Sequence, residues 1–254
     1  MPEPRLELHG VSVAYGSRPV VAEVSLRLAP GRILGLVGES GSGKTTLARA
    51  IVGLVRPDAG RITLDGVELG SRRTRAERRA IQLVQQDPFA SLNPQLRVGA
   101  VIDELLAVHH LHGNRAGRRA RAAELLGLVG LKPDALERYP RQFSGGERQR
   151  IAIARALAVE PAVLVADEPT SSLDVSVQKT VLELLATLAS SMNLATLLIS
   201  HDLSVIHAVC SEVAVLRAGE VVEWAPAERF FTHPEHPYSR ALLQAVPRIP
   251  KVGP

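Results

Sequence analysis

The stretch from Gly38 to Thr45 has the residue types and spacing of a phosphate-binding loop. Its sequence, GESGSGKT, fits the pattern of a glycine, four intervening residues, and then glycine, lysine and serine or threonine. Glycines in such a loop let backbone N–H groups converge on phosphate oxygens, and the following helix start adds partial positive charge. We expect Lys44 to reach the β- and γ-phosphates of a nucleoside triphosphate and the Thr45 hydroxyl to bind Mg²⁺. The residues expected to contact the nucleotide here are Gly38, Glu39, Ser40, Gly41, Ser42, Gly43, Lys44, Thr45 and Thr46.

Two adjacent carboxylates are suited to hold Mg²⁺ and to activate the water that hydrolyses a nucleoside triphosphate. The run AVLVADEP is apolar until Asp167 and Glu168, which indicates a buried strand with two acids at its polar end. Asp167 suits the acidic residue that holds Mg²⁺, usually through water. Glu168 is the expected general base for the attacking water. Together with the phosphate-binding loop, this pair predicts hydrolysis of a nucleoside triphosphate.

A second glycine-rich helix start, FSGGERQR, lies at Phe143 to Arg150, far along the chain from the first loop. Ser144 and Glu147 have the spacing of a capping box, in which each side chain accepts a hydrogen bond from the other residue's backbone N–H. The sequence thus contains two turns suited to phosphate, which raises the question of why one small chain needs both.

An alternation of strands and helices is expected to position these residues. The apolar run 32–37 indicates a buried strand that ends at the loop, and apolar positions in 47–55 have helical spacing. Alternating residues in 6–15 and 24–28 indicate half-buried strands. An Asp-Gly pair within 61–69 indicates a hairpin.

The second half of the chain returns to strands after a helical insertion from about residue 90 to 158. Strands are expected in 162–169 and 195–202, and a hairpin in 212–224. Between the strands, one helical face is predicted to carry Val181, Leu184, Leu185, Leu188 and Met192. This order argues for a mostly parallel sheet, and we expect the early hairpins to form its antiparallel edge.

Length, composition and charge limit the classes of protein to which this chain can belong. The chain has 254 residues, of which 46% are hydrophobic, so it can bury a substantial core. Its net charge is +4, but its basic runs 71–80 and 114–122 contain no interleaved aromatics, so we expect solvated helix faces rather than a nucleic-acid surface. The single cysteine, Cys210, excludes an internal disulfide and is expected to be buried. No apolar run approaches the roughly 18 residues that span a bilayer, and a signal-peptide pattern is missing, so we expect a soluble, cytoplasmic protein.

The phosphate-binding loop, the acidic strand end and FSGGE, in this order, resemble the ATP-binding cassette (ABC) family of ATPases over nearly the whole chain. The resemblance implies an α/β P-loop NTPase (RecA-like) core with an antiparallel β subdomain and an inserted α-helical subdomain. Residues 1–88 and 159–232 correspond to the core with its β subdomain, 89–158 to the helical subdomain and 233–254 to a C-terminal tail. It also implies that two cassettes pack head to tail around two ATP molecules, and that one chain's signature turn covers the γ-phosphate held by the other. The signature residues are Ser144, Gly145, Gly146 and Glu147.

Further roles follow from the resemblance position by position. Tyr15 matches the aromatic residue that stacks on adenine. Gln86, or its neighbour Gln85, matches the glutamine that senses Mg²⁺ and water and contacts the membrane partner. Asp174 ends the segment SSLD, which resembles the loop that communicates across the dimer and is expected to contribute to the nucleotide site. His201 matches the histidine that contacts the γ-phosphate.

The signature differs from the family's usual leucine-serine-glycine-glycine-glutamine at two positions. Phe143 replaces leucine, which is a hydrophobic exchange of little consequence. Glu147 replaces glutamine and adds a negative charge near a polyphosphate. The capping-box spacing offers a local explanation for this residue. We expect Glu147 to reduce ATP-driven dimer affinity without abolishing activity.

Two further segments, QQDPFASLNPQLRVG (85–99) and HPEHPYSRALLQAVP (233–247), resemble the oligopeptide, dipeptide and nickel importer ATPases. This implies two transmembrane permeases, a second cassette of the same or a paralogous chain, and indirectly an extracytoplasmic solute-binding protein. The expected location is the cytoplasmic face of a bacterial membrane, as a peripheral protein. Two alternatives stay open: an accessory cassette of the carbon–phosphorus lyase type, and a nucleic-acid-remodelling ATPase, which only the basic pI favours. No nucleic-acid partner is expected.

Overall fold

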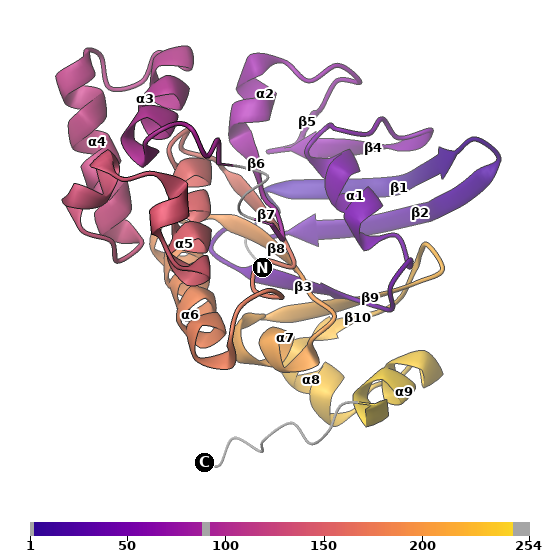
Figure 1. The fold of residues 1–254 in the computed structure, drawn as a ribbon. Coiled ribbons are helices and arrows are strands. Elements are labelled where there is room, and N and C mark those ends of the chain that lie inside the picture. The colour runs from indigo at the N-terminus through magenta and orange to yellow at the C-terminus, as the bar shows by residue number, and fades with distance from the viewer. Residues whose placement is uncertain (1–2, 88–91, 246–254) are drawn as a thin grey trace.

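The computed structural model describes residues 3–87 and 92–245, which form two sheets and a group of helices (Figure 1). The larger sheet has six strands. In spatial order they are β10 (Glu220–Pro226), β9 (Glu212–Arg217), β3 (Ile33–Val37), β8 (Ala195–Ile199), β7 (Val163–Asp167) and β6 (Ile81–Val84). Neighbours from β9 to β6 are parallel, and β10 is antiparallel to β9. Every residue of β3 and β8 is buried, as expected for central strands covered on both faces.

The parallel register brings the ends of four strands to one edge of this sheet. Leu36 pairs with Ile199, Ile199 with Asp167, and Ala166 with Val84. The residues that follow β3, β8, β7 and β6 therefore leave the sheet side by side. In open α/β sheets, ligands bind at this carboxyl edge.

The early strands form a separate antiparallel sheet of four strands. In spatial order they are β2 (Arg18–Leu28), β1 (Leu6–Tyr15), β4 (Ala59–Leu64) and β5 (Val67–Glu68). The prediction that the early hairpins form the edge of the parallel sheet is therefore wrong, because the antiparallel edge comes from β10 at the end of the chain. Alternating residues give β1 and β2 one apolar face. That face packs on β3 and on helix α1 (Lys44–Ile51) in a shared core, rather than extending the sheet sideways.

The helices that lie between β6 and β7 in chain order gather on one side of the molecule (Figure 1). The α-helices of the described residues are α1 (Lys44–Ile51), α2 (Arg75–Ala80), α3 (Val98–Val108), α4 (Arg115–Leu128), α5 (Gly145–Leu157), α6 (Val175–Ser191), α7 (Leu203–Val209), α8 (Ala227–Thr232) and α9 (Pro237–Ala245). Two short 3₁₀ helices, η2 (Pro133–Glu137) and η3 (Pro140–Gln142), precede α5. Helices α3, α4 and α5 share an apolar core with the predicted face of α6. The expected start of the helical insertion at 89 and the part of the tail beyond 245 lie outside the described residues.

Three other sequence-based expectations can be compared with the structure. Cys210 is buried, as predicted. The basic runs mostly form exposed helix faces with ion pairs, such as Arg118 to Asp103 at 2.7 Å. Arg73 departs from this pattern, because it is buried and donates a hydrogen bond to the carbonyl of Gly70 at the edge of the smaller sheet. None of the helices that the structure describes is both long and apolar enough to cross a bilayer.

Candidate active site

The loop between β3 and α1 has a backbone that glycine alone can adopt at two positions. Gly43 has a φ of 108°, and a Cβ atom there would lie 2.5 Å from the carbonyl oxygen of Val20 on β2. A Cβ atom on Gly38 would lie 2.1 Å from the carbonyl oxygen of Leu216 on β9. The loop is thus wedged between both sheets. Gly43 is the N-cap of α1 and provides no side-chain acceptor, so the first N–H groups of this helix stay available to an anion.

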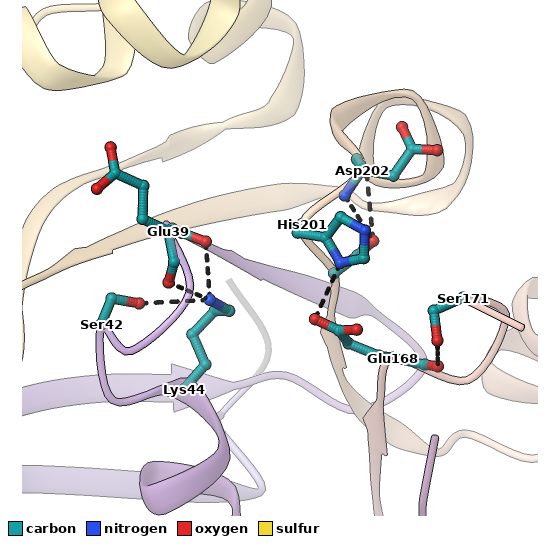
Figure 2. A network of polar contacts seen from close by, with 9 residues as sticks. Glu39, Ser42, Lys44, Glu168, Ser171, His201 and Asp202 are labelled. Atoms are coloured by element: carbon teal, nitrogen blue, oxygen red, sulfur yellow. Dashed lines mark hydrogen bonds and ion pairs between the residues drawn. The ribbon is translucent and has the colours of Figure 1, made fainter. Parts of the chain in front are cut away.

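Lys44 is held by its own loop (Figure 2). Its Nζ atom donates hydrogen bonds of 2.7 Å to the carbonyl oxygens of Gly38 and Glu39, and lies 3.4 Å from Ser42 Oγ. Burial lowers the pKa of Lys44, while the charges of Glu168, Asp167 and Glu39 act in the opposite direction. A buried ammonium group bound only to neutral oxygens is well placed to exchange them for an anion.

Asp167, at the end of β7, lies against the start of α1. Burial raises the pKa of this carboxyl group, and a hydrogen bond from the Thr45 side chain acts to lower it. A hydroxyl and a carboxylate in contact are the hard oxygen ligands that Mg²⁺ prefers. The chemistry of this donor pair therefore fits the metal expected from the sequence. Across the described residues, no group of three or more His, Cys, Asp or Glu side chains is arranged to hold a metal ion.

Glu168 and His201 face each other from neighbouring strand ends (Figure 2). Nδ1 of His201 lies 3.0 Å from Oε1 of Glu168. Glu168 has a φ of 48°, a left-handed conformation that is uncommon outside glycine and costs roughly 1–3 kcal/mol. It is fixed by its own N–H, which donates to the carbonyl of Ile199, and by the hydroxyl of Ser171, which donates to its carbonyl. Strain of this kind clusters at active sites.

Of these groups, Lys44, Thr45, Glu168 and His201 line one cleft of about 480 Å³, and Asp167 contacts that lining through Thr45. Its lining residues are Val20, Ser40, Gly41, Gly43, Lys44, Thr45, Thr46, Glu168 and His201. The structure thus brings together most of the loop with the predicted general base and the predicted γ-phosphate histidine. It combines a cationic group, helix N–H groups and a carboxylate–imidazole pair, which can bind a polyphosphate and activate water.

Other predicted site residues lie outside this cleft. Tyr15 is at the end of β1, half exposed, and does not line it. Gln86 and Gln85 are exposed just after β6. Because Val84 pairs with Ala166, Gln86 leaves the sheet at the same edge as Glu168. The roles predicted for these residues stay predictions.

The signature turn begins α5, and it too lies outside the cleft. The N–H and the hydroxyl of Ser144 both donate to Glu147 Oε2 at 2.9 Å, and the N–H of Glu147 donates to Ser144 Oγ at 3.3 Å. The predicted capping box is therefore confirmed. The hydrogen bond from the Ser144 backbone lowers the pKa of Glu147.

The starts of α5 and α6 are in close contact. A Cβ atom on Gly146 would lie only 2.1 Å from Cγ1 of Val177, so glycine is required there. Asp174 is the N-cap of α6, and its carboxylate accepts the N–H of Val177 at 3.0 Å. A Cβ atom on Gly145 would lie 3.3 Å from Cδ2 of Leu173, a tight but adjustable contact. The signature turn and the segment from Ser171 to Asp174 therefore form one surface, and neither of them lines the cleft.

One contact to the loop was not predicted. The hydroxyl of Tyr238, in α9, accepts a hydrogen bond from the N–H of Glu39 at 3.1 Å. The two residues are 199 positions apart, and no local pattern signals the contact. From the sequence alone, the segment around Tyr238 indicates the importer subgroup and no contact with the loop.

Comparison with protein families gives two matches. The family model described as ABC transporter matches residues 21–171, and the model described as oligopeptide/dipeptide transporter, C-terminal region, matches residues 222–253. A relative from Brucella ovis, provisionally named a peptide import ATP-binding protein, is 45% identical over 251 residues, which cover 96% of this chain and 79% of the relative. A Brucella abortus protein with the same kind of name is 49% identical over 240 residues, 92% of this chain and 71% of its own length.

The fold of this chain is also similar to that of solved structures. CbiO1 of Clostridium perfringens, part of the ABC transporter complex cbiONQ, has a TM-score of 0.83 at 24% identity over 91% of each chain. A dimeric structure of MJ0796, described as a bacterial ABC transporter cassette, has a TM-score of 0.77 at 28% identity, covering 87% of this chain and 98% of that one. A post-hydrolysis dimer of MJ0796, bound to ADP and Pi, scores 0.75 at 29% identity over the same shares.

Proposed function

This chain belongs to the ABC transporter family of ATPases, and from that premise we propose that it is the ATP-hydrolysing subunit of a peptide importer. Two features support import of peptides in particular. Its C-terminal part matches the region characteristic of oligopeptide and dipeptide transporters, and its relatives at 45% and 49% identity are named for peptide import. A nickel complex is the second solute class that the subgroup includes. The solute itself is selected by the permeases and the binding protein.

One observation carries the proposal. The cleft collects Lys44, Glu168 and His201 from a single chain, whereas the signature turn starting at Ser144 does not line it. A second chain, packed head to tail, supplies that turn to the nucleotide. This arrangement answers why the sequence has two glycine-rich helix starts. Each serves a different molecule of ATP, and the dimeric cassette structures among the similar proteins agree with it.

Within the cleft, each residue acts through a defined group. Lys44 moves its ammonium from the loop carbonyls to the β- and γ-phosphate oxygens. Glu168 accepts a proton from the attacking water, and His201, hydrogen-bonded to Glu168, contacts the γ-phosphate. Thr45, Asp167 and Gln86 are the residues that would hold Mg²⁺, which would neutralise charge on the phosphate oxygens. Tyr15 stacks on adenine, and the partner's signature turn covers the γ-phosphate.

The working complex contains more than this chain. It includes two transmembrane permeases and a second cassette, identical or paralogous. An extracytoplasmic binding protein is an indirect partner that delivers the solute to the permeases. Gln86 contacts the permeases, and the chain sits peripherally on the cytoplasmic face of a bacterial membrane. Closure of the cassettes on ATP and their opening after loss of the γ-phosphate form the two-state motion that drives transport.

Purification from the native membrane tests this proposal. The tagged chain is solubilised with its partners, and the proteins that co-purify are identified by mass spectrometry. We expect two permeases and a second cassette, with ATPase activity in the complex. Recovery of soluble phosphonate-cleaving enzymes in place of permeases would instead support an accessory cassette, and DNA-stimulated ATPase activity would support a nucleic-acid-remodelling enzyme.

A further inference from the structure

The C-terminal helix α9 contacts the phosphate-binding loop through the hydroxyl of Tyr238. The Tyr238 hydroxyl accepts the N–H of Glu39, while the carbonyl of Glu39 accepts a hydrogen bond from Lys44 Nζ. The residue Glu39 is therefore held from both sides, by the tail and by the lysine. Figure 2 shows Lys44 reaching the Glu39 carbonyl, with the yellow C-terminal ribbon passing above.

Tyr238 is held firmly in this position. The half-buried phenol ring lies under the guanidinium of Arg217, whose carbon is 5.0 Å from the ring centroid. The N–H of Tyr238 donates to Nδ1 of His236 at 3.1 Å. Arg217 is the last residue of β9, directly after the Leu216 carbonyl that packs against Gly38.

The segment before α9 is anchored by a buried carboxylate. Glu223, on β10, is only 9% exposed and accepts the N–H groups of Glu235 and His236, each at 2.9 Å. Burial alone would raise the pKa of Glu223, but the neighbouring Ser239 side chain, these two backbone N–H groups and the charge of His236 outweigh it, and the net pKa is lowered. Hydrogen bonds to a carboxylate are about twice as strong as neutral ones. These two bonds therefore attach the segment before α9 to strand β10 of the larger sheet.

We propose that Tyr238 is a positioning residue of the nucleotide site, and that the tail, docked through Glu223, holds the loop in its phosphate-binding conformation. Lys44 must leave the carbonyls of Gly38 and Glu39 to reach a phosphate. The Tyr238 bond is then the remaining side-chain restraint on Glu39 seen in the structure. It sits on the side of the loop that the cleft does not use, because neither Glu39 nor Tyr238 lines the cleft.

A thermodynamic consequence follows. If tail docking favours the loop conformation that binds ATP, then ATP favours tail docking by the same factor. The subgroup's C-terminal segment thus becomes part of the nucleotide site rather than an appendage. This inference rests on the proposed function only in assuming that ATP occupies the cleft.

Tyr238→Phe in the full chain tests the proposal, because it removes one hydroxyl and keeps the ring under Arg217. One neutral hydrogen bond contributes about 0.5–1.5 kcal/mol, so we expect the Kd for ATP to rise about two- to tenfold. The KM for ATP should rise by a similar factor, while kcat at saturating ATP stays unchanged. Tyr139→Phe, which removes a hydroxyl from the residue preceding η3, is the matched control and should leave the Kd unaltered.

Two further measurements separate the outcomes. Glu223→Gln leaves the Tyr238 hydroxyl in place but loosens its anchor, so its effect on Kd should be less than additive with that of Tyr238→Phe. Without nucleotide, hydrogen exchange in peptides covering residues 38–43 should be faster in Tyr238→Phe than in wild type. Wild-type Kd and exchange in Tyr238→Phe would overturn the proposal. Failure of the wild-type chain to bind ATP would overturn the proposed function instead, and the exchange comparison would still decide the role of Tyr238.

Discussion

The imidazole of His201 and the carboxylate of Glu168 share a hydrogen bond of 3.0 Å across the neighbouring ends of β8 and β7. The bond fixes both groups at the cleft, although the histidine side chain is 62% exposed and the glutamate side chain only 22%. The less exposed group is shielded and oriented, as a general base requires, and the exposed one projects toward the space above the loop. This difference in environment supports the assignment of the base to Glu168 rather than to His201.

Glu168→Gln should keep ATP binding and lose turnover. The amide is nearly isosteric but cannot accept a proton, and general-base catalysis contributes about a hundredfold or more. We expect kcat to fall at least that far while the Kd for ATP is retained, and an ATP-bound dimer to accumulate in sedimentation analysis. Normal hydrolysis by this variant would move the base role elsewhere, with His201 as the next residue to substitute.

Lys44→Ala should remove most of the affinity for nucleotide. Hydrogen bonds to charged groups contribute about 1.5–3 kcal/mol each, so loss of the ammonium should weaken ATP binding by about a hundredfold or more. Equilibrium binding with Mg²⁺ present measures this directly. Lys179→Ala is the control, because that lysine is exposed on α6 and its nearest partner is Glu183 at 3.8 Å. Equal affinity in wild type and Lys44→Ala would contradict the assignment of the loop.

Gly146→Ala should disturb the packing of the signature turn against α6. The new methyl group would lie 2.1 Å from Cγ1 of Val177, a β-branched side chain with little rotamer freedom on a helix. Overpacking of this kind costs about 1–3 kcal/mol of unfolding free energy. We expect a lower Tm and reduced ATPase activity.

Val177→Ala provides the internal control for that clash. Of the three atoms nearest to the new methyl, Cβ of residue 177 would then remain, at 3.5 Å, which is ordinary van der Waals contact. In the Val177→Ala background, Gly146→Ala should therefore cost much less than in wild type. A cost that is the same in both backgrounds would show that the contact does not explain the glycine.

Much of the site is encoded locally, and this is the part that the sequence predicts. The strand, loop and helix around Lys44 follow from periodicity and glycine spacing, and the capping box of Ser144 and Glu147 follows from residues three positions apart. What depends on distant partners is not predictable in this way. Alternation shows that β1 has one apolar face but not which surface covers it, so the early hairpins were assigned to the wrong sheet. The contact between Tyr238 and Glu39 spans 199 positions and depends on the completed fold.

Glu147→Gln should strengthen ATP-driven dimerisation a few-fold. Glu147 carries its charge at the turn that, in the proposed dimer, faces the partner's polyphosphate, and its removal lowers repulsion there. Sedimentation at increasing ATP, in a Glu168→Gln background that prevents turnover, measures the effect. Glu124→Gln is the control, because Glu124 is exposed on α4. This change removes the same charge elsewhere and should leave dimerisation unchanged. An unaltered ATP dependence in Glu147→Gln would show that the capping box already neutralises the effect of this charge.

The same substitution should also change how stability depends on pH. The hydrogen bond from the Ser144 backbone lowers the pKa of Glu147 in the folded state below the unfolded value of about 4.3. A carboxyl group with a lowered folded pKa stabilises the protein above its unfolded pKa, and this contribution is lost as the pH falls through the folded pKa. Since glutamine does not titrate, the decrease in unfolding free energy between neutral pH and about pH 3 should be smaller in Glu147→Gln than in wild type, by up to about 1 kcal/mol, a typical capping contribution. Denaturant unfolding at both pH values measures the difference, and parallel losses in the two proteins would mean that the capping box does not contribute to stability through its charge.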